Sequence, residues 1–199
     1  MAADEEPPTQ LWLVRHGETA WSATGRHTSR TDVPLTERGR ARATDLRTRL
    51  AGIDFDLVLT SPLGRARETC ALAGFEDRAE IVDDLHEWDY GTGEGLTTAQ
   101  IREISPDWTV WTHDLPGSEP ASEVCARADR VVARARAARG RTIAFSHGHM
   151  SRVIGARWIG LVVADGSRLR LDTAAVSVLG WERETPVLHR WNDTGALPG

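Results

Sequence analysis

Short runs of apolar residues, each bounded by turn-forming or charged residues, recur along the chain. Runs of this length predict β-strands. The predicted strands are Leu11–Val14, Phe55–Leu59, Glu80–Val82 and Thr142–Phe145. Two later runs, Ala175–Leu179 and Val187–Trp191, predict strands that pair antiparallel at one edge of the sheet.

Longer segments between these runs carry apolar residues at helical spacing. Thr36 is a typical N-cap and predicts a helix that continues to about Leu50. Further helices are predicted at Leu63–Leu72, Glu123–Ala138 and Met150–Ile159. Strands that alternate with helices are typical of an α/β fold. We therefore expect three α/β/α layers with a mostly parallel central sheet.

Length and composition favour one domain. A chain of 199 residues with 40 % hydrophobic content can bury one sizeable core. We expect a single domain over residues 1–199, with flexible ends at 1–9 and 194–199. The N-terminal segment lacks the apolar stretch of a secretory signal, and no apolar run is long enough for a membrane span. We therefore expect a cytoplasmic protein in which Cys70 and Cys125 are buried free thiols.

The charge of the chain argues against two classes of partner. The formal net charge is −5 at pH 7, and neither nucleic acids nor anionic membranes attract an acidic protein. All 24 basic residues are Arg, because the sequence contains no Lys. Any anion-binding site in this chain must therefore use Arg or His.

Polar and charged residues follow directly after four of the predicted strands. In open parallel sheets, ligands bind at the carboxyl ends of the strands, beside helix N-termini that favour anions. The spacing therefore brings two His, two Arg and one Glu to one edge of the sheet: His16, His147, Arg15, Arg65 and Glu87.

Such a set of residues is sufficient for phosphoryl transfer. A neutral imidazole nitrogen can attack phosphorus directly. Fixed guanidinium groups and N–H donors can stabilise the charge on the phosphoryl oxygens. A carboxylic acid beside the leaving oxygen can protonate it and then deprotonate the attacking water.

The motifs that contain these residues resemble the signature of the histidine phosphatase superfamily, which has the phosphoglycerate-mutase-like fold. The resemblance covers about Leu11 to Val178. Five motifs occur in the order of the family: Leu-Val-Arg15-His16-Gly17-Glu18-Thr19, Asp32-Val-Pro-Leu-Thr36-Glu-Arg-Gly39, Ser61-Pro-Leu-Gly-Arg65-Ala-Arg-Glu-Thr69, Leu85-His-Glu87-Trp-Asp-Tyr90-Gly91 and Ser146-His147-Gly148.

The resemblance implies a role for each matched residue. His16 matches the phosphorylated histidine, Arg15, Arg65 and His147 match the phosphate cradle, and Glu87 matches the proton donor. Arg67 lies in the same motif as Arg65 but on a different face of the predicted helix, so we assign the role to Arg65. We expect substrate contacts from Ser22, Thr28, Ser29, Tyr90, Gly148 and His149.

Three members of this set permit other interpretations. His147 and His149 form an H-x-H pair that could ligate a metal ion, but no Cys or acidic cluster accompanies them. Because side chains alternate at a strand end, the two His should also point to opposite sides. We therefore expect no metal and no cofactor. Glu87 could instead be a solvated acid, since other acidic residues lie close to it.

The remaining aromatic residues are assigned mostly to packing. We expect Trp12, Trp158 and Trp181 in the core, and Trp21 and Trp88 as walls of the pocket. The other histidines are expected at the surface or in packing, and they are His27, His86, His113 and His189.

Departures from the mutase members of the superfamily favour hydrolysis. Ser22, Thr28–Ser29 and Thr98 stand where the mutases carry Asn, Thr-Gly and Lys. The segment between Glu87 and His147 is also shorter and lacks the paired arginines of the mutases. With fewer cations and a more open lid, water should intercept the phosphohistidine.

Segments around Trp21, Glu87 and Trp108 resemble actinobacterial acid phosphatases and the broad-specificity phosphatase branch. The sequence therefore predicts metal-independent hydrolysis of a small phosphorylated metabolite, fastest at acidic pH, with His147 acting as an imidazolium. A cofactor-dependent phosphoglycerate mutase and a non-catalytic phosphate-binding module are the alternatives. Trp- and Val-rich segments near the C-terminus could form the edge of a homodimer.

Overall fold

A six-stranded sheet forms the centre of the protein, in a computed structural model that describes residues 9–195. The flexibility expected for the two ends falls mainly on residues 1–8 and 196–199, outside the described residues. The spatial order of the strands is β3-β2-β4-β1-β5-β6. Their bounds are β1 Gln10–Arg15, β2 Leu57–Thr60, β3 Ala79–Ile81, β4 Arg141–Ser146, β5 Val176–Glu182 and β6 Thr185–Asp193.

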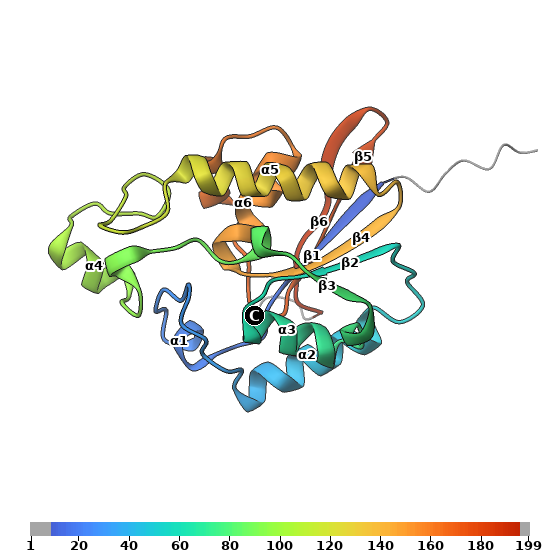
Figure 1. The fold of residues 1–199 in the computed structure, drawn as a ribbon, viewed down its shortest axis with the longest axis horizontal. Coiled ribbons are helices and arrows are strands. Elements are labelled where there is room, and N and C mark those ends of the chain that lie inside the picture. The colour runs from blue at the N-terminus through green and yellow to red at the C-terminus, as the bar shows by residue number, and fades with distance from the viewer. Residues whose placement is uncertain (1–8, 196–199) are drawn as a thin grey trace, which may run out of the picture.

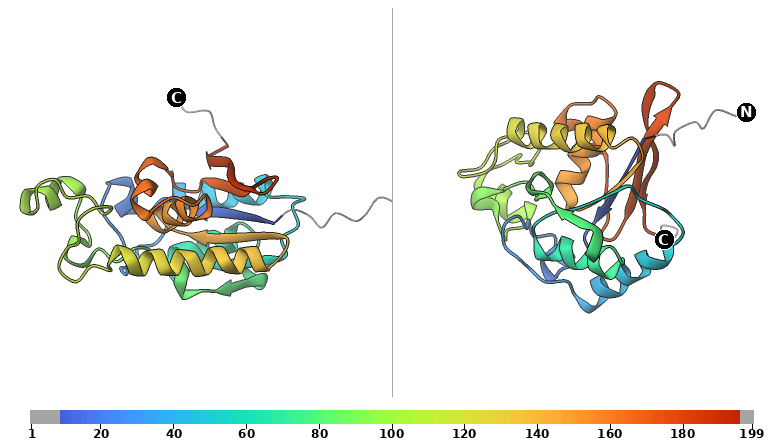
Figure 2. Two further views of the ribbon diagram at one scale, coloured as in Figure 1. Left: turned by 90° about the horizontal axis from the view of Figure 1, so that it is seen from above. Right: turned by 45° about the vertical axis from the view of Figure 1, so that its right-hand side comes forward.

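The first four strands pair in parallel, and β5 and β6 continue the sheet antiparallel from β1. Helices α2 and α3 cover one face, and α5 and α6 cover the other (Figures 1 and 2). The α-helices are α1 Ala20–Ala23, α2 Glu37–Arg49, α3 Gly64–Leu72, α4 Thr98–Ile104, α5 Ala121–Ala137 and α6 Gly148–Trp158. The short 3₁₀ turns are η1 Glu76–Arg78, η2 Asp83–Leu85, η3 Gly91–Gly93 and η4 Val163–Arg168. The predicted three-layer α/β fold is confirmed.

The alternation of side chains along β1 divides the core into two halves. Leu11 and Leu13 point into the half that contains α5 and α6, whereas Val14 and Trp12 belong to the half beneath α2 and α3. Apolar residues of α5 recur on one face, as predicted, and that face is buried. Both faces of the sheet are thus covered, and its strand ends are the places where polar groups meet.

Several element boundaries differ from those predicted. Phe55 precedes β2 and packs edge-on against Trp12, at 5.5 Å between ring centroids. Val82 follows β3, and α6 begins at Gly148 rather than Met150. The short helix α4 was not predicted, because its seven residues carry one buried side chain, that of Ile101, and so have little apolar periodicity.

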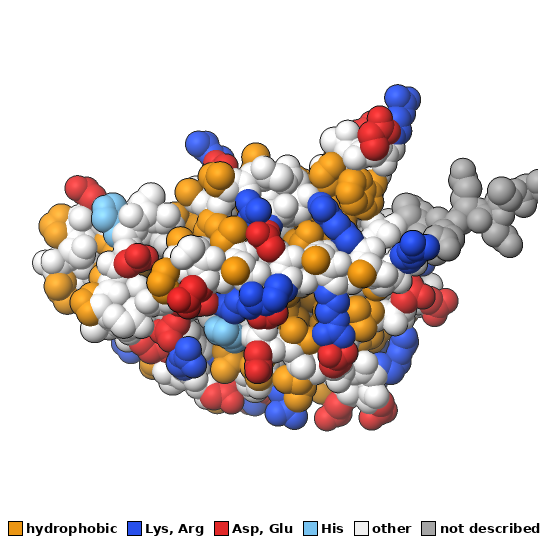
Figure 3. Space-filling view, turned by 45° about the horizontal axis from the view of Figure 1, so that its top comes forward, with side chains coloured by type: hydrophobic (Ala, Val, Ile, Leu, Met, Phe, Trp, Pro, Cys, Tyr) orange, Lys and Arg blue, Asp and Glu red, His pale blue; other side chains and the backbone are white. Residues whose placement is uncertain are grey.

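Of the core assignments, Trp158 is fully buried, while Trp12 and Trp181 are half-buried. Both cysteines are free, as expected, but Cys125 is only half-buried. Burial raises the pKa of the Cys70 thiol to about 12. Basic and acidic side chains intermingle on the face seen in Figure 3, so that face presents no patch of one sign within the described residues. None of the helices in residues 9–195 has the length and apolar character of a membrane span.

Candidate active site

Close backbone packing fixes the segment that follows β1. A Cβ atom on Gly39 would lie 2.2 Å from the carbonyl oxygen of Glu18, and one on Gly17 would lie 2.6 Å from the carbonyl oxygen of Gly39. Thr36 caps α2 by accepting a hydrogen bond from the Gly39 N–H, and its hydroxyl donates to Oε1 of Glu18 at 2.9 Å. The first turn of α2 is therefore locked against the residues beside His16.

His16 lies at the carboxyl end of β1, and 5 % of its surface is exposed. Its Nδ1 atom is 2.7 Å from the carbonyl oxygen of Gly17. Because a carbonyl only accepts hydrogen bonds, Nδ1 carries the proton and Nε2 keeps its lone pair. Burial, followed by the charges of Arg65 and Arg15, lowers the pKa of His16 well below its usual value. His16 is therefore a neutral imidazole with an available nucleophilic nitrogen.

Arg65 is buried in the first turn of α3, whereas Arg67 is exposed. The two residues thus lie on different faces of the helix, as expected when the role in the site was assigned to Arg65. Its Nη1 donates to the carbonyl oxygen of Thr31 at 3.0 Å, and its Nη2 donates to those of Thr28 and Ser29 at 3.1 and 2.9 Å. Burial lowers the pKa of Arg65, and nearby acids, Glu87 first, partly restore it. The side chain thus joins α3 to the loop at residues 28–31.

Arg15 enters the same region from the end of β1. Its Nη1 donates to the carbonyl oxygen of Leu171 at 2.5 Å. A Cβ atom on Gly148 would lie 3.4 Å from the guanidinium carbon, so the start of α6 packs directly on this group. Burial lowers the pKa of Arg15, against the opposing charge of Glu87.

His147 follows β4 and is fully buried beside His16, at 5.2 Å between ring centroids. Its Nε2 is 2.7 Å from Oγ of Ser61, which also accepts a hydrogen bond from the Leu63 N–H. We assign the Ser61 hydroxyl as the donor to Nε2, and with this assignment the imidazole proton lies on Nδ1. Burial and the charge of Arg65 lower the pKa of His147 well below its usual value, so the expected imidazolium is disfavoured without a substrate.

Three N–H donors of these residues share one property. Arg15 Nε, Arg65 Nε and His147 Nδ1 are buried and have no hydrogen-bond partner among the described residues. An unsatisfied buried donor costs about 1–3 kcal/mol. Phosphoryl oxygens would supply the missing acceptors, with two of the three donors on cationic groups.

Glu87 is buried, and its carboxylate lies against the N-terminus of α6. Oε1 accepts hydrogen bonds from the backbone N–H groups of Trp88 and Met150 at 3.0 and 2.8 Å. Oε2 accepts from the N–H of His149 at 3.0 Å and is the less committed oxygen. Burial and the adjacent Glu87 raise the pKa of Tyr90 well above its usual value, so its hydroxyl stays protonated.

A cavity of about 150 Å³ opens beside His16 and Glu87. Its lining includes most of the predicted site residues: Arg15, His16, Ser22, Thr28, Glu87, Tyr90, Gly148 and His149. Arg65, His147 and Ser29 are buried and do not line it.

The predicted substrate-binding residues of the loop after β1 also hold that loop together. Ser22 and Thr19 form a capping box at α1, with the Ser22 hydroxyl donating to the Thr19 carbonyl oxygen. The Ser29 N–H donates to Oε2 of Glu94 at 2.8 Å, while the buried Ser29 hydroxyl has no partner in the described structure. Both residues therefore make hydrogen bonds that hold the loop in place, and the hydroxyl of Ser29 is left for another partner.

Other lining residues were not predicted from the sequence: Gly25, Arg26, His27, Arg152 and Leu171. The His27 ring packs 4.8 Å from Tyr90 and 5.1 Å from Trp108, between ring centroids. The guanidinium of Arg152 lies 4.6 Å from the ring centroid of Trp111. Arg152 follows His147 by five residues, within the second turn of α6, and that spacing was an available signal.

Two expected pocket walls do not line this cavity. Trp21 is half-buried outside it, and Trp88 is buried with its indole N–H donating to the carbonyl oxygen of Glu119. The reason is that the Glu87 carboxylate turns toward α6, while the next side chain points toward the segment before α5.

His147 and His149 bind different partners. His147 contacts Ser61, while Nδ1 of His149 is 2.6 Å from the hydroxyl of Tyr90. The separation arises because α6 begins between the two histidines, rather than from alternation along a strand. In residues 9–195 no group of three or more His, Cys, Asp or Glu side chains is placed to hold a metal ion.

The fold and these side chains define an α/β protein with an anion site built from His and Arg at the strand ends. Comparison with known proteins identifies the family: the chain matches the histidine phosphatase superfamily (branch 1) over residues 11–194. The chain therefore belongs to this superfamily and is a phosphatase of the family, which confirms the resemblance carried by the motifs.

Individual relatives agree with this assignment. An acid phosphatase of Mycobacterium tuberculosis is 47% identical over 178 residues, which cover 87% of each chain. Sedoheptulose 1,7-bisphosphatase of Saccharomyces cerevisiae is 34% identical over 185 residues, covering 76% of this chain and 68% of the yeast protein. A solved structure of an open reading frame from Mycobacterium tuberculosis has a TM-score of 0.89 and 43% identity, covering 94% of this chain and 98% of the other.

Proposed function

We propose that the protein hydrolyses small phosphomonoesters through a phosphohistidine at His16, without a metal ion and fastest at acidic pH. Arg15, Arg65 and His147 bind the phosphoryl oxygens, and Glu87 transfers the proton. One observation carries the proposal: the free Nε2 lone pair of His16 lies among buried donors that lack partners in the described structure.

In the first step, Nε2 of His16 attacks phosphorus. The N–P bond forms while the P–O bond to the leaving group breaks, and its electron pair stays on the leaving oxygen. Arg15 and Arg65 stabilise the charge on the equatorial oxygens, and Nδ1–H of His147 donates a further hydrogen bond. Glu87 gives its proton to the leaving oxygen, so an alcohol departs.

In the second step, water attacks the phosphohistidine. The carboxylate of Glu87 takes a proton from this water as the new P–O bond forms and the N–P bond breaks. Inorganic phosphate leaves, and His16 and Glu87 return to their starting states. The less committed Oε2 of Glu87 supports this alternation between acid and base.

The cavity supports a small substrate. Its volume of about 150 Å³ is below the range typical of drug-sized ligands. We assign the contacts with substrate to Ser22, Thr28, Tyr90, Gly148 and His149, which line the cavity, while Ser29, also expected at the site, lies buried outside its lining.

The acidic optimum follows from two opposite requirements. His16 must be neutral to attack, and Glu87 must be protonated to release an alkoxide. The lowered pKa of His16 keeps its imidazole neutral into the acidic range, and a general acid acts only in its protonated form, which acidic pH favours.

The test is hydrolysis of ³²P-labelled p-nitrophenyl phosphate in EDTA, with quenching in alkaline detergent, which preserves the acid-labile N–P bond, to trap labelled protein. The wild-type protein should hydrolyse the ester and give a labelled histidine. His16→Ala should keep less than about a hundredth of the activity and give no label, because covalent catalysts rarely survive loss of the nucleophile. Exposed His189→Ala is the control and should match the wild type.

Two results would contradict the proposal. Substantial activity of His16→Ala would remove His16 as the nucleophile. Isomerisation of 3-phosphoglycerate that depends on 2,3-bisphosphoglycerate and exceeds hydrolysis would favour the mutase. Cytoplasmic location and a homodimer stay predictions.

A further inference from the structure

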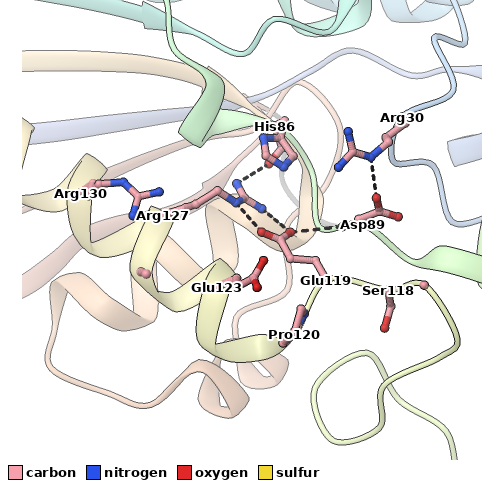
Figure 4. Close-up of a pocket in the computed structure, with 11 residues that line it drawn as sticks. Arg30, His86, Asp89, Ser118, Glu119, Pro120, Glu123, Arg127 and Arg130 are labelled. Atoms are coloured by element: carbon pink, nitrogen blue, oxygen red, sulfur yellow. Dashed lines mark hydrogen bonds and ion pairs between the residues drawn. The ribbon is translucent and has the colours of Figure 1, made fainter.

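A buried ion pair outside the cavity beside His16 contacts the segment that carries Glu87. Arg127 of α5 and Glu119, just before α5, contact each other in the lining of the pocket shown in Figure 4. Nε and Nη2 of Arg127 each lie 2.7 Å from a different carboxylate oxygen of Glu119. Their side chains are 7 % and 10 % exposed, so the two-pronged pair is almost removed from water.

Arg127 holds the backbone on the N-terminal side of Glu87. Its Nη1 donates to the carbonyl oxygens of Asp84 and His86 at 2.8 and 3.1 Å. The same atom lies 3.4 Å from the sulfur of Met150, the residue whose N–H binds Oε1 of Glu87. One guanidinium thus contacts both the Glu87 segment and the helix end that receives the Glu87 carboxylate.

Glu119 holds the backbone on the C-terminal side of Glu87. Its carbonyl oxygen accepts from the indole N–H of Trp88 at 2.8 Å, and its own N–H donates to the carbonyl oxygen of Asp89 at 3.0 Å. The residues before and after Glu87 are therefore each tied to one member of the ion pair. Neither member is among the residues that line the cavity beside His16.

We propose that the Arg127–Glu119 pair positions Glu87 for proton transfer to the leaving oxygen. The pair acts through backbone contacts on both sides of Glu87 and touches neither the substrate nor the reacting atoms. The inference rests on the proposed acid role of Glu87. A proton donor loses efficiency when it leaves hydrogen-bond reach of the acceptor, so its support should matter most where protonation matters most.

A neighbouring ion pair provides a matched control. Arg130 lies one turn further along α5 and binds the side chain of Asp84, with distances of 2.9 and 2.6 Å. Its side chain is 58 % exposed, and its hydrogen bonds in the described structure reach a carboxylate rather than the backbone around Glu87. Arg127→Lys and Arg130→Lys make the same chemical change in the same helix, against the same segment.

The experiment measures kcat/KM for esters whose leaving groups differ in their need for a proton. The series runs from p-nitrophenyl phosphate through phenyl phosphate to glycerol phosphate. Arg127→Lys should lose at least about tenfold more on glycerol phosphate than on p-nitrophenyl phosphate, a part of the ~10²–10⁴ contributed by general acid catalysis. Arg130→Lys should keep both rates within about twofold of wild type, as an exposed pair contributes little.

Glu119→Gln and Glu87→Gln complete the design. Glu119→Gln retains the shape and the backbone contacts of Glu119 but weakens the bond to Arg127, and it should shift the leaving-group dependence in the same direction. It also keeps the test valid if Arg127→Lys folds poorly. Inhibition by inorganic phosphate should stay within about threefold of wild type in both positioning variants, since the Arg and His cradle is unchanged.

The outcomes separate the two hypotheses. If Glu87→Gln shows the wild-type leaving-group dependence, the acid role of Glu87 is wrong. If Glu87→Gln steepens the dependence while folded Arg127→Lys and Glu119→Gln lose all substrates in parallel, the positioning role is wrong and the proposed function stands. Equal effects of Arg127→Lys and Arg130→Lys would also overturn the inference.

Discussion

The hydroxyl of Thr69 accepts a hydrogen bond from the backbone N–H of Gly17 at 2.9 Å. The same hydroxyl donates to the carbonyl oxygen of Arg65 at 2.7 Å, one turn earlier in α3. A single buried oxygen thereby links the segment after His16 to the helix that carries Arg65. The relative position of the proposed nucleophile and this arginine depends on an atom that meets no substrate.

Replacing this hydroxyl should affect both stability and catalysis. Thr69→Val leaves the Gly17 N–H buried without its acceptor, which should lower the free energy of unfolding by about 1–3 kcal/mol and reduce kcat. Thr44→Val is the control, since Thr44 makes the same type of bond to the Arg40 carbonyl on an exposed part of α2. Chemical denaturation and steady-state kinetics provide the measurements. A Thr69→Val protein as stable and active as Thr44→Val would show that the link is dispensable.

Arg65→Lys should be far more costly than Arg67→Lys. An ammonium group cannot reach several loop carbonyls and still direct a buried N–H toward phosphate. We expect kcat/KM to fall by about 10²-fold or more at Arg65, comparable to loss of an oxyanion donor. Exposed Arg67 should tolerate the change within about twofold. Equal kinetic losses at the two positions would reverse the assignment.

The activity of the enzyme should follow a bell-shaped pH profile. The pKa of His16 is lowered by burial, Arg65 and Arg15, so its protonation limits the rate only below the usual range of histidine. We expect an optimum between about pH 5 and 6.5 for glycerol phosphate, with a descending limb because general acid catalysis is lost as pH rises. The descending limb should be weaker for p-nitrophenyl phosphate, whose leaving group needs little protonation. An optimum above neutrality for the alkyl ester would contradict this assignment.

Stability should also decrease on the acidic side of neutrality. The pKa values of His16, His147 and His149 are lowered, first by burial, so in this range the unfolded chain binds protons that the folded chain does not. The contribution of these histidines to the free energy of unfolding is fully present above their unfolded pKa of about 6.5. Below that pH it falls by about 1.4 kcal/mol per pH unit for each histidine. Denaturant titrations between about pH 7.5 and 5 measure this slope, above the range in which carboxylates such as Asp84 lose their ion pairs.

A pair of substitutions isolates the histidine contribution. His149→Gln should remove the contribution of one proton from the slope of unfolding free energy against pH. His113→Gln, at an exposed position, should leave the slope unchanged. A slope that His149→Gln does not alter would mean that His149 is protonated in the folded protein.

The sequence could predict the residues that follow strands, because a strand end fixes where the next side chains lie. His16, Ser61 and His147 each come directly after β1, β2 or β4. The choice of Arg65 over Arg67 was also accessible, since helical spacing separates a buried face from an exposed one.

Residues that reach the site through tertiary packing were less predictable. Leu171 arrives from beyond η4, and His27 is positioned by rings from two other segments. The orientation of Trp88 depended on the segment before α5, whose path no local pattern records. The same reason hides the Arg127–Glu119 pair, because its partners are backbone atoms and backbone carries no sequence signal.

The contacts of Arg65 limit how this enzyme could acquire new substrates. Its guanidinium holds residues 28–31, while its buried Nε–H has no partner among the described residues. A substitution in that loop that suits a new organic group would disturb the rate at which phosphorus is attacked. Exposed Arg26 lines the same cavity but takes no part in the hydrogen bonds of Arg65. Selection for altered substrate preference should therefore fix changes at position 26 before changes at 28–31.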